Sequence, residues 1–220
     1  YRLADLAMGS GHFLVAAVDR IESRMRDFLA EPGMDIPGVN AELARLAHAA
    51  KEALGRDEVA FQEIEQATLL RRQIARRCVY GIDINPLAVE LSRLALWIHT
   101  FVPGLPMSTL DHNLVCANSL TGIGTVDEAK KVLDFDALAP GDLALFGSIV
   151  DESLAKARDI LVDVAHLSEA TKAEAKEVQE RLEQAKQAAE PTRKIFDAAV
   201  AVRTGKAKGK GLSTEEELID

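Results

Sequence analysis

The sequence predicts an α/β fold in which a parallel, doubly wound sheet with a helical insertion is followed by a helical hairpin. Over residues 1–122, short strand-like stretches alternate with helical ones, which is typical of a parallel sheet. Farther along, apolar residues recur every three or four positions in two long segments, which predicts helices with one apolar side. The chain has 220 residues, of which 48% are hydrophobic, so it is long enough to bury a core.

The first part of the chain, residues 1–122, carries the expected sheet. A loop with two glycines separates the first strand from the first helix, and a helical insertion at about residues 31–76 precedes the second strand. Pro86 suits the first turn of the helix that follows this second strand. The expected strands are residues 1–6, 77–83 and 112–116, and the expected helices are residues 12–29, 40–54, 57–76 and 86–100.

The second part, residues 123–204, is expected to form a loop and an antiparallel helical hairpin. Its helices are expected over about residues 145–167 and 168–202, each with one apolar seam. The seam residues are Leu154, Ala157, Leu161 and Val164 in the first helix and Ala175, Val178, Leu182, Ala185 and Ala189 in the second. Such a hairpin fits either a bridge to another domain or a solvated spacer. Residues 205–220 are expected to form a flexible tail because glycine and lysine alternate at their start.

The overall charge of the chain bears on its partners. The 26 Lys and Arg against 35 Asp and Glu give a net charge of −9, whereas a module that grips DNA normally presents a basic face. We therefore do not expect this segment to hold DNA by itself. There is no signal peptide and no apolar run long enough to cross a bilayer, so we expect a cytoplasmic protein without a membrane partner. The chain begins at Tyr1, directly on a strand-like stretch, which suggests a fragment of a larger protein.

The few cysteines and histidines do not predict a metal site. Cys78 and Cys116 lie far apart, each beside apolar residues, and are expected to be free, buried thiols. His12, at the start of a helix, is expected only to pack or cap. We expect His99 and His112 to be structural and Trp97 to belong to the core.

A basic cluster lies at the end of the second helix of the insertion. Arg71, Arg72, Arg76 and Arg77 suit either DNA phosphates or the C-terminal end of a helix. The acidic balance of the whole chain favours the helix end.

The loop from Asp5 to Gly11 is the strongest chemical signal. A strand that ends in two nearby glycines and is followed by a helix lets the backbone approach a ligand closely, although tight strand–helix turns also use glycine for purely structural reasons. A dinucleotide fingerprint needs a third glycine, and that position is Leu14. The acid that such a fingerprint needs, for which Asp83 is the best candidate, lies beyond the insertion. The pattern therefore disfavours NAD.

Three motifs together resemble the amino-methyltransferase family that modifies adenine N6 in DNA. They are Asp5-x-Ala7-x-Gly9-Ser10-Gly11-x-Phe13, then Tyr80-Gly-Ile-Asp83-Ile-Asn-Pro86-Leu-Ala-Val-Glu-Leu, then Leu114-Val-Cys-Ala-Asn118-Ser119-Leu120. They come in the family's order, each at the end of an expected strand, and the resemblance covers residues 1–122. The long insertion and the sequence Leu110-Asp-His-Asn-Leu are most similar to fused type IIG restriction–methylation enzymes and to phage-defence methylases of the BREX type.

The resemblance implies a Rossmann-like S-adenosylmethionine-dependent sheet, here incomplete, and a role for each matching residue. The loop residues Asp5, Ala7, Gly9, Ser10 and Gly11 would hold the methionine part of the cofactor. Asp83 would accept hydrogen bonds from the ribose hydroxyls and Ile84 would pack on the adenine ring. Asn118 would meet the adenine amine, beside Ser119 of the same motif. Many relatives carry Asp at the position of Asn118, which accepts through its carbonyl oxygen but has no charge.

The same resemblance shows what this segment lacks. The family uses an Asn-Pro-Pro-aromatic motif to hold the target adenine, and no such sequence is present here. We therefore name no catalytic residue and expect the segment alone to be inactive. In the parent protein, DNA would be the partner, with a specificity or nuclease domain beside it. Two alternatives remain: a methyltransferase acting on RNA or protein amides, and a non-catalytic interaction module on a vestigial methyltransferase fold.

Overall fold

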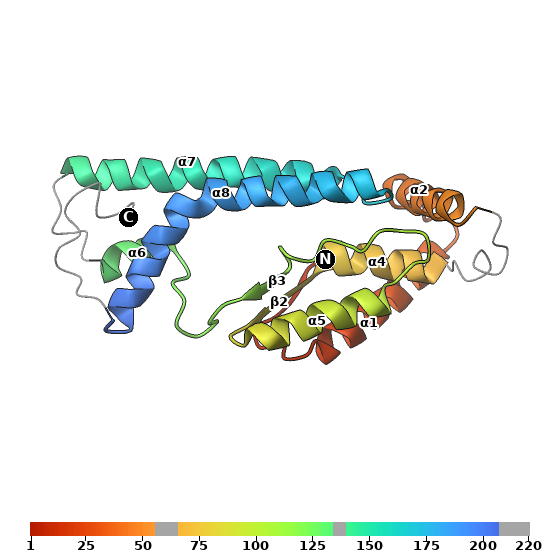
Figure 1. Ribbon diagram of the computed structural model, residues 1–220, viewed down its shortest axis with the longest axis horizontal. Coiled ribbons are helices and arrows are strands. Elements are labelled where there is room, and N and C mark those ends of the chain that lie inside the picture. The colour runs from red at the N-terminus through yellow and green to blue at the C-terminus, as the bar shows by residue number, and fades with distance from the viewer. Residues whose placement is uncertain (56–65, 134–139, 207–220) are drawn as a thin grey trace. The chain divides into compact units, whose positions relative to one another are not determined.

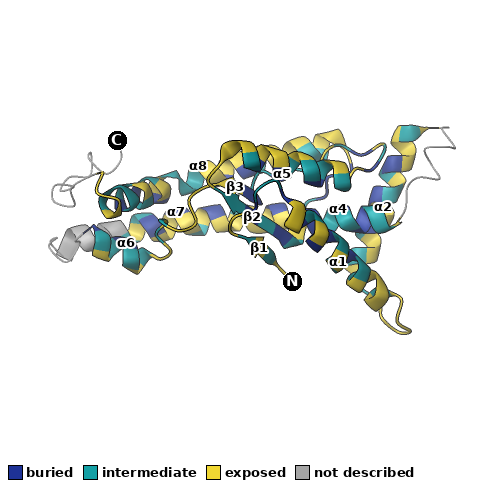
Figure 2. Cartoon of the chain, turned by 90° about the horizontal axis from the view of Figure 1, so that it is seen from below, coloured by how far each residue is buried: buried dark blue, intermediate teal, exposed yellow. Residues whose placement is uncertain are grey.

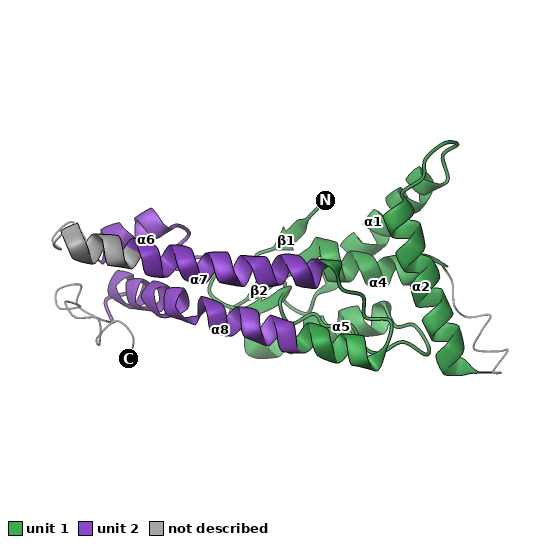
Figure 3. Cartoon of the chain, turned by 90° about the horizontal axis from the view of Figure 1, so that it is seen from above, with its two compact units in different colours: residues 1–119, 166–179 green, residues 120–165, 180–220 purple. Residues whose placement is uncertain are grey.

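The computed structural model describes residues 1–55, 66–133 and 140–206 of the chain (Figure 1). The chain divides into two compact units (Figure 3). The first contains Tyr1–Ser119 with His166–Gln179, and the second contains Leu120–Ala165 with Glu180–Asp220. The first unit therefore holds all the residues that the sequence places at the candidate binding site.

The first unit is built on a short parallel sheet of three strands in the order β1 (Leu3–Asp5), β2 (Val79–Asp83) and β3 (Leu114–Cys116). Leu3 pairs with Val79, and Gly81 pairs with Leu114. Because neighbouring parallel strands run the same way, each connection must cross back over the sheet, and helices make these crossings. The expected α/β fold with a parallel sheet is confirmed.

The chain of this unit forms four described helices before residue 100. They are α1 (His12–Leu29), α2 (Pro37–Leu54), α4 (Gln66–Cys78) and α5 (Pro86–His99). The first of these has the predicted bounds. The predicted start of the helix before β2, at residue 57, lies outside the described residues. Asn85 caps α5, since its side-chain oxygen accepts a hydrogen bond of 3.0 Å from Leu87 N, and Pro86 follows at the first helical position.

The second strand begins two residues later than predicted because α4 continues to Cys78 and runs directly into β2. Helix ends leave carbonyl groups without partners inside the helix. The buried Asn113 satisfies two of them: its Nδ2 donates to Ala75 O at 3.3 Å and to Arg76 O at 3.1 Å. Because its side chain binds the end of α4, Asn113 precedes β3. The strand begins at Leu114 and not at residue 112, as was predicted.

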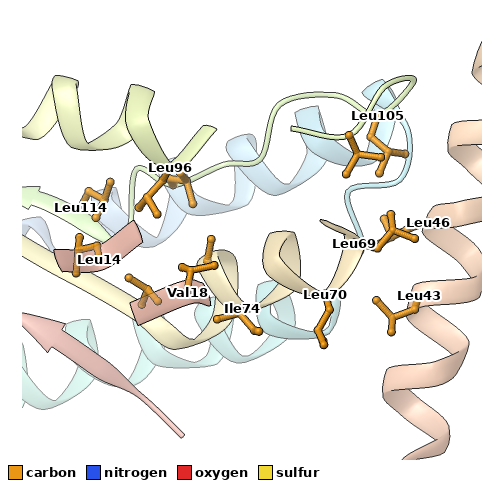
Figure 4. Packing of buried hydrophobic residues seen from close by; sticks show 14 of the residues in the cluster. Leu14, Val18, Leu43, Leu46, Leu69, Leu70, Ile74, Leu96, Leu105 and Leu114 are labelled. Atoms are coloured by element: carbon orange, nitrogen blue, oxygen red, sulfur yellow. The ribbon is translucent and has the colours of Figure 1, made fainter. Parts of the chain in front are cut away.

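The core of this unit lies between the sheet and α1, α4 and α5 and continues between α2 and α4 (Figure 4). Its fully buried members include Leu14, Val18, Leu46, Ile74, Val79, Leu96 and Leu114. Gly81 lets the loop after β1 approach this core, because a Cβ atom there would lie 2.2 Å from Met8 Sδ and 3.0 Å from Leu14 Cδ1. Figure 2 shows how buried and exposed residues alternate around the helices.

The second unit contains α6 (Val126–Val132), most of α7 (Pro140–His166) and most of α8 (Lys172–Arg203). Within it the two long helices run antiparallel (Figure 1). Its core comprises Ala129, Leu133, Val150, Ile195 and Ala199.

The predicted seam of α7 is partly wrong. Ala157 and Val164 are buried, but Leu154 and Leu161 are each 42% exposed. The buried side instead includes Ser153, whose hydroxyl pairs with the hydroxyl of Thr192 on α8. A pattern of apolar residues cannot reveal a seam position that is occupied by a paired serine.

The seam of α8 follows the prediction at three positions and contains one feature that the pattern did not show. Val178, Leu182 and Ala185 are buried, as predicted. Pro191 lies inside the helix, where proline removes one backbone donor and bends the axis.

No helix among the described residues is both long and apolar enough to cross a membrane.

Candidate functional site

The loop after β1 turns sharply and is held by its own backbone. Asp5 ends the strand, and its Oδ1 accepts a hydrogen bond of 3.0 Å from Ala7 N. Gly9 and Gly11 have φ angles of 55° and 82°, the left-handed region that favours glycine. Gly11 N donates to Met8 O at 2.9 Å, and α1 begins at the next residue.

The two glycines differ in what surrounds them. A Cβ atom on Gly11 would lie 3.0 Å from Ser92 on α5, so this glycine also permits close packing. A Cβ atom on Gly9 would meet nothing within 4 Å. The positive φ and the close contact with Ser92 together explain why position 11 is glycine. Beside Gly9 the backbone faces open space, where a ligand could approach.

Asp83 lies at the carboxyl end of β2 and joins this loop to the second strand. Its Oδ2 accepts a hydrogen bond of 2.9 Å from Gly9 N, and its Oδ1 accepts one of 2.8 Å from Asn85 N. These backbone donors, Asn85 first and then Gly9, lower the pKa of Asp83 below its ordinary value of 3.8. The carboxylate is thus charged at neutral pH. Since its two oxygens have about four acceptor positions, it retains capacity for further donors.

Ser92 on α5 is a residue that the sequence analysis missed. It is fully buried, and its Oγ donates a hydrogen bond of 2.7 Å to Gly9 O. The backbone of Gly9 is therefore held on both sides, at its N–H by Asp83 and at its carbonyl by Ser92. The available signal was weak: a serine shares the buried side of α5 with Val89 and Leu96.

The segment after β3 reaches the same edge of the sheet. Ala117 N donates to Asp83 O at 3.0 Å, and Ser119 Oγ donates to Leu6 O at 2.8 Å. Ser119 thus connects the end of the third strand to the end of the first, across the end of the second. Asn118 lies between these two anchored residues.

Apolar and polar side chains flank these contacts. Ile84, directly after Asp83, is 67% exposed, so its side chain is available to pack against a flat apolar group. Ser10 Oγ and His12 Nδ1 form a hydrogen bond of 2.9 Å, so this histidine pairs with its neighbouring side chain and does not cap a backbone group of α1. Both cysteines are free as predicted, but neither is buried as predicted: Cys78 is half-buried and Cys116 is exposed.

All nine residues of the predicted site lie on the three segments that these hydrogen bonds join: Asp5, Ala7, Gly9, Ser10, Gly11, Asp83, Ile84, Asn118 and Ser119. The arrangement offers a carboxylate, an amide, open space beside a glycine backbone and an exposed apolar side chain. The described residues contain no group of three or more His, Cys, Asp or Glu side chains placed to hold a metal ion.

The predicted basic cluster before β2 has an internal role. Arg72 and Arg76 are buried and contact the carboxylate of Glu169, while Arg71 pairs with Asp19 and Glu22. Arg76 and Arg77 lie in the last turn of α4, so the predicted helix-end position is confirmed for these two, and the ion pairs within the first unit are a further role that was not predicted. Long-range pairing of this kind leaves no pattern in the sequence near the arginines.

Comparison with known proteins gives one relationship. No family model matches the chain, and no solved structure is significantly similar to it. The chain is 30% identical over 150 residues to a protein of Methanocaldococcus jannaschii named as a putative type II restriction enzyme and methyltransferase. The chain is thus similar to a protein whose name gives it a restriction–modification methyltransferase function. The match covers 62% of this chain but only 10% of that relative, so the chain spans about a tenth of the relative's length.

Proposed function

We propose that this chain binds S-adenosylmethionine as part of a DNA adenine-N6 methyltransferase of a restriction–modification or phage-defence system. The observation that carries the proposal is the position of Asp83, which lies at the end of β2 and accepts a hydrogen bond from the glycine loop after β1. The similarity to a restriction–modification methyltransferase supports the class of enzyme.

The residues at the site fit this cofactor. The ribose of a nucleoside presents vicinal hydroxyl donors, and the carboxylate of Asp83 accepts hydrogen bonds without offering any. The exposed Ile84 would cover one side of the adenine ring, and Asn118 would accept from the adenine amine. The open space beside Gly9 would take the methionine part. When bound, the cofactor would supply an electrophilic methyl group on a sulfonium.

Methyl transfer to adenine N6 needs more than this segment contains. The amine lone pair is delocalised into the ring, and the family's Asn-Pro-Pro-aromatic motif accepts the amine protons and stacks the flipped base. These 220 residues include no such motif, so we assign them cofactor binding and no catalytic residue. The DNA contacts would belong to other parts of the whole protein, in keeping with the net charge of −9.

Calorimetric titration with S-adenosylmethionine tests the cofactor assignment. We expect saturable binding by the wild-type chain and at least about tenfold weaker binding by Asp83→Ala, because a charged acceptor is lost. Asp27→Ala is the matched control, since it removes the same charge from an exposed position on α1 and should leave the affinity unchanged. Near-wild-type affinity in a folded Asp83→Ala variant would contradict the role given to this residue.

Product analysis with the whole protein tests the substrate. Transfer of labelled methyl groups to DNA, recovered as N6-methyladenine, is the expected result. Recovery of the labelled methyl groups in RNA or in protein amides would show that one of those, and not DNA adenine, is the substrate. An absence of cofactor binding by both the chain and the whole protein would favour a non-catalytic interaction module.

A further inference from the structure

A cavity of about 300 Å³ lies at the C-terminal end of α5. Its walls are mainly apolar and include Leu94, Trp97, Ile98, Phe101 and Met107. This volume is at the lower end of the range for small-molecule sites, which are typically apolar with a few polar groups. The cavity is separate from the candidate cofactor site, because Ile98 follows Pro86 by 12 residues, or about 18 Å along the helix.

Two polar side chains in the wall of this cavity have atoms without hydrogen-bond partners. Arg72 and Ser108 are each 2% exposed, and among the described residues Arg72 Nε and Ser108 Oγ have no hydrogen-bond partner. Leaving a buried polar atom unpaired costs on the order of 1–3 kcal/mol, so such atoms usually have a partner of some kind. Trp97 Nε1 donates to Ser108 O at 2.7 Å and thereby orders both residues in the wall.

The charge of Arg72 is only partly balanced within the protein. Its Nη2 lies 3.8 Å from Glu169 Oε2, but the same carboxylate oxygen lies 3.1 Å from Arg76 Nε and accepts from Thr109 N at 3.1 Å. One buried carboxylate thus serves two buried guanidinium groups. Glu42 acts on Arg72 as a further, weaker acidic neighbour, yet burial still lowers the pKa of Arg72 to about 10. A second anion close to Arg72 would be stabilised.

We propose that this cavity binds a small organic acid whose apolar part is about as large as a phenylalkyl group. The apolar part would fill the space between Trp97, Ile98 and Phe101. The carboxylate would accept hydrogen bonds from Ser108 Oγ and Arg72 Nε, two buried donors in the cavity wall for which the described residues provide no acceptor. The mouth of the cavity suits entry of such a ligand, since Ile98 and Met107 are mostly exposed.

Trp97 supplies a direct readout because it is the only tryptophan of the chain. We would titrate the protein with 4-phenylbutyrate and follow the intrinsic tryptophan fluorescence. The expected result is a saturable change, with at least about tenfold weaker binding of 4-phenylbutylamine, which has the same apolar part and the opposite charge. Equal responses to the acid and the amine, as a merely apolar docking surface for another protein segment would give, overturn the proposal.

Two exposed positions on α5 supply a matched pair of variants. Ile98→Glu places a negative charge at the mouth of the cavity and should abolish binding of the acid. Leu91→Glu makes the same change at an exposed position outside the cavity, so binding of the acid should remain intact. Ile98 is 70% exposed and Leu91 46% exposed, so neither substitution buries the new charge and both variants should fold. Ser108→Ala should lower the affinity for the acid by about threefold or more, because one hydrogen-bond donor is lost. A non-saturating signal, or equal effects of the two glutamate variants, would rule out the site.

Discussion

Asp83 and Gly9 are 74 residues apart in the sequence, yet Asp83 Oδ2 accepts a hydrogen bond of 2.9 Å from Gly9 N. This bond holds the glycine loop to the end of β2. The same carboxylate also accepts from Asn85 N just before α5, so one side chain organises the loop, the strand and the start of the following helix.

The pKa of Asp83 makes the stability of this region dependent on pH. Because its pKa in the folded protein is lowered below 3.8, its stabilising effect is fully present above 3.8 and is lost as the pH falls through the folded-state pKa. Asp83→Asn should therefore unfold more easily than wild type at neutral pH, and the difference should shrink below pH 3.8. Urea denaturation of both proteins at several pH values measures this. A difference that stays constant down to the most acidic samples would show that the charge is not responsible.

The two glycines of the loop should respond differently to alanine. Gly11→Ala adds a Cβ atom 3.0 Å from Ser92 in addition to the strain of a positive φ, whereas Gly9→Ala carries only the strain. We expect Gly11→Ala to lose at least about 1 kcal/mol more unfolding free energy than Gly9→Ala. Thermal or urea unfolding gives the comparison. If the proposed function is right, Gly9→Ala should mainly weaken the binding of S-adenosylmethionine, since its new methyl group enters the open space proposed for the cofactor. Equal stability of the two variants would mean that contact with Ser92 is not what requires glycine at Gly11.

Ser92 should position the loop without touching a ligand. Ser92→Ala leaves Gly9 O without its donor. This loss should cost about 1 kcal/mol of unfolding free energy and lower the affinity for S-adenosylmethionine several-fold. Thr100→Val is the control on the same helix: Thr100 Oγ1 donates to Leu96 O within α5, so this variant should lose stability without losing cofactor affinity. If calorimetry finds the same affinity in both variants, Ser92 has a structural role only.

Interactions that are local in the sequence could be predicted from it, whereas pairings between distant residues could not. The bounds of α1 and the place of Asp83 at a strand end follow from periodicity and from glycine and proline positions, which are local signals. Ser92, Asn113 and Glu169 have partners from about 35 to nearly 100 residues away, and their neighbours in sequence do not predict those partners. The seam of α7 was misjudged for a related reason, since the pairing of Ser153 with Thr192 depends on the other helix.

Glu169 should be among the most sensitive positions of the chain. It is fully buried in the segment between α7 and α8, where its carboxylate contacts Arg72 and Arg76 of α4 and accepts from Thr109 N. Glu169→Gln keeps the shape but leaves two buried guanidinium groups without the carboxylate that contacts them, and only the weaker influence of Glu42 remains. Removing one partner of a buried ion pair typically costs about 3–5 kcal/mol, and we expect a loss near the lower end because the amide oxygen still accepts.

An exposed ion pair supplies the control for this prediction. Glu183 pairs with Lys186 on α8, and both side chains are more than half exposed, so Glu183→Gln should change the unfolding free energy by less than about 1 kcal/mol. Urea unfolding of the two variants at neutral pH is the measurement. If Glu169→Gln is as stable as Glu183→Gln, the buried arginines must be stabilised by something other than this carboxylate. A large loss in Glu169→Gln alone would show that this single buried charge holds the segment between the long helices to the first unit's own core.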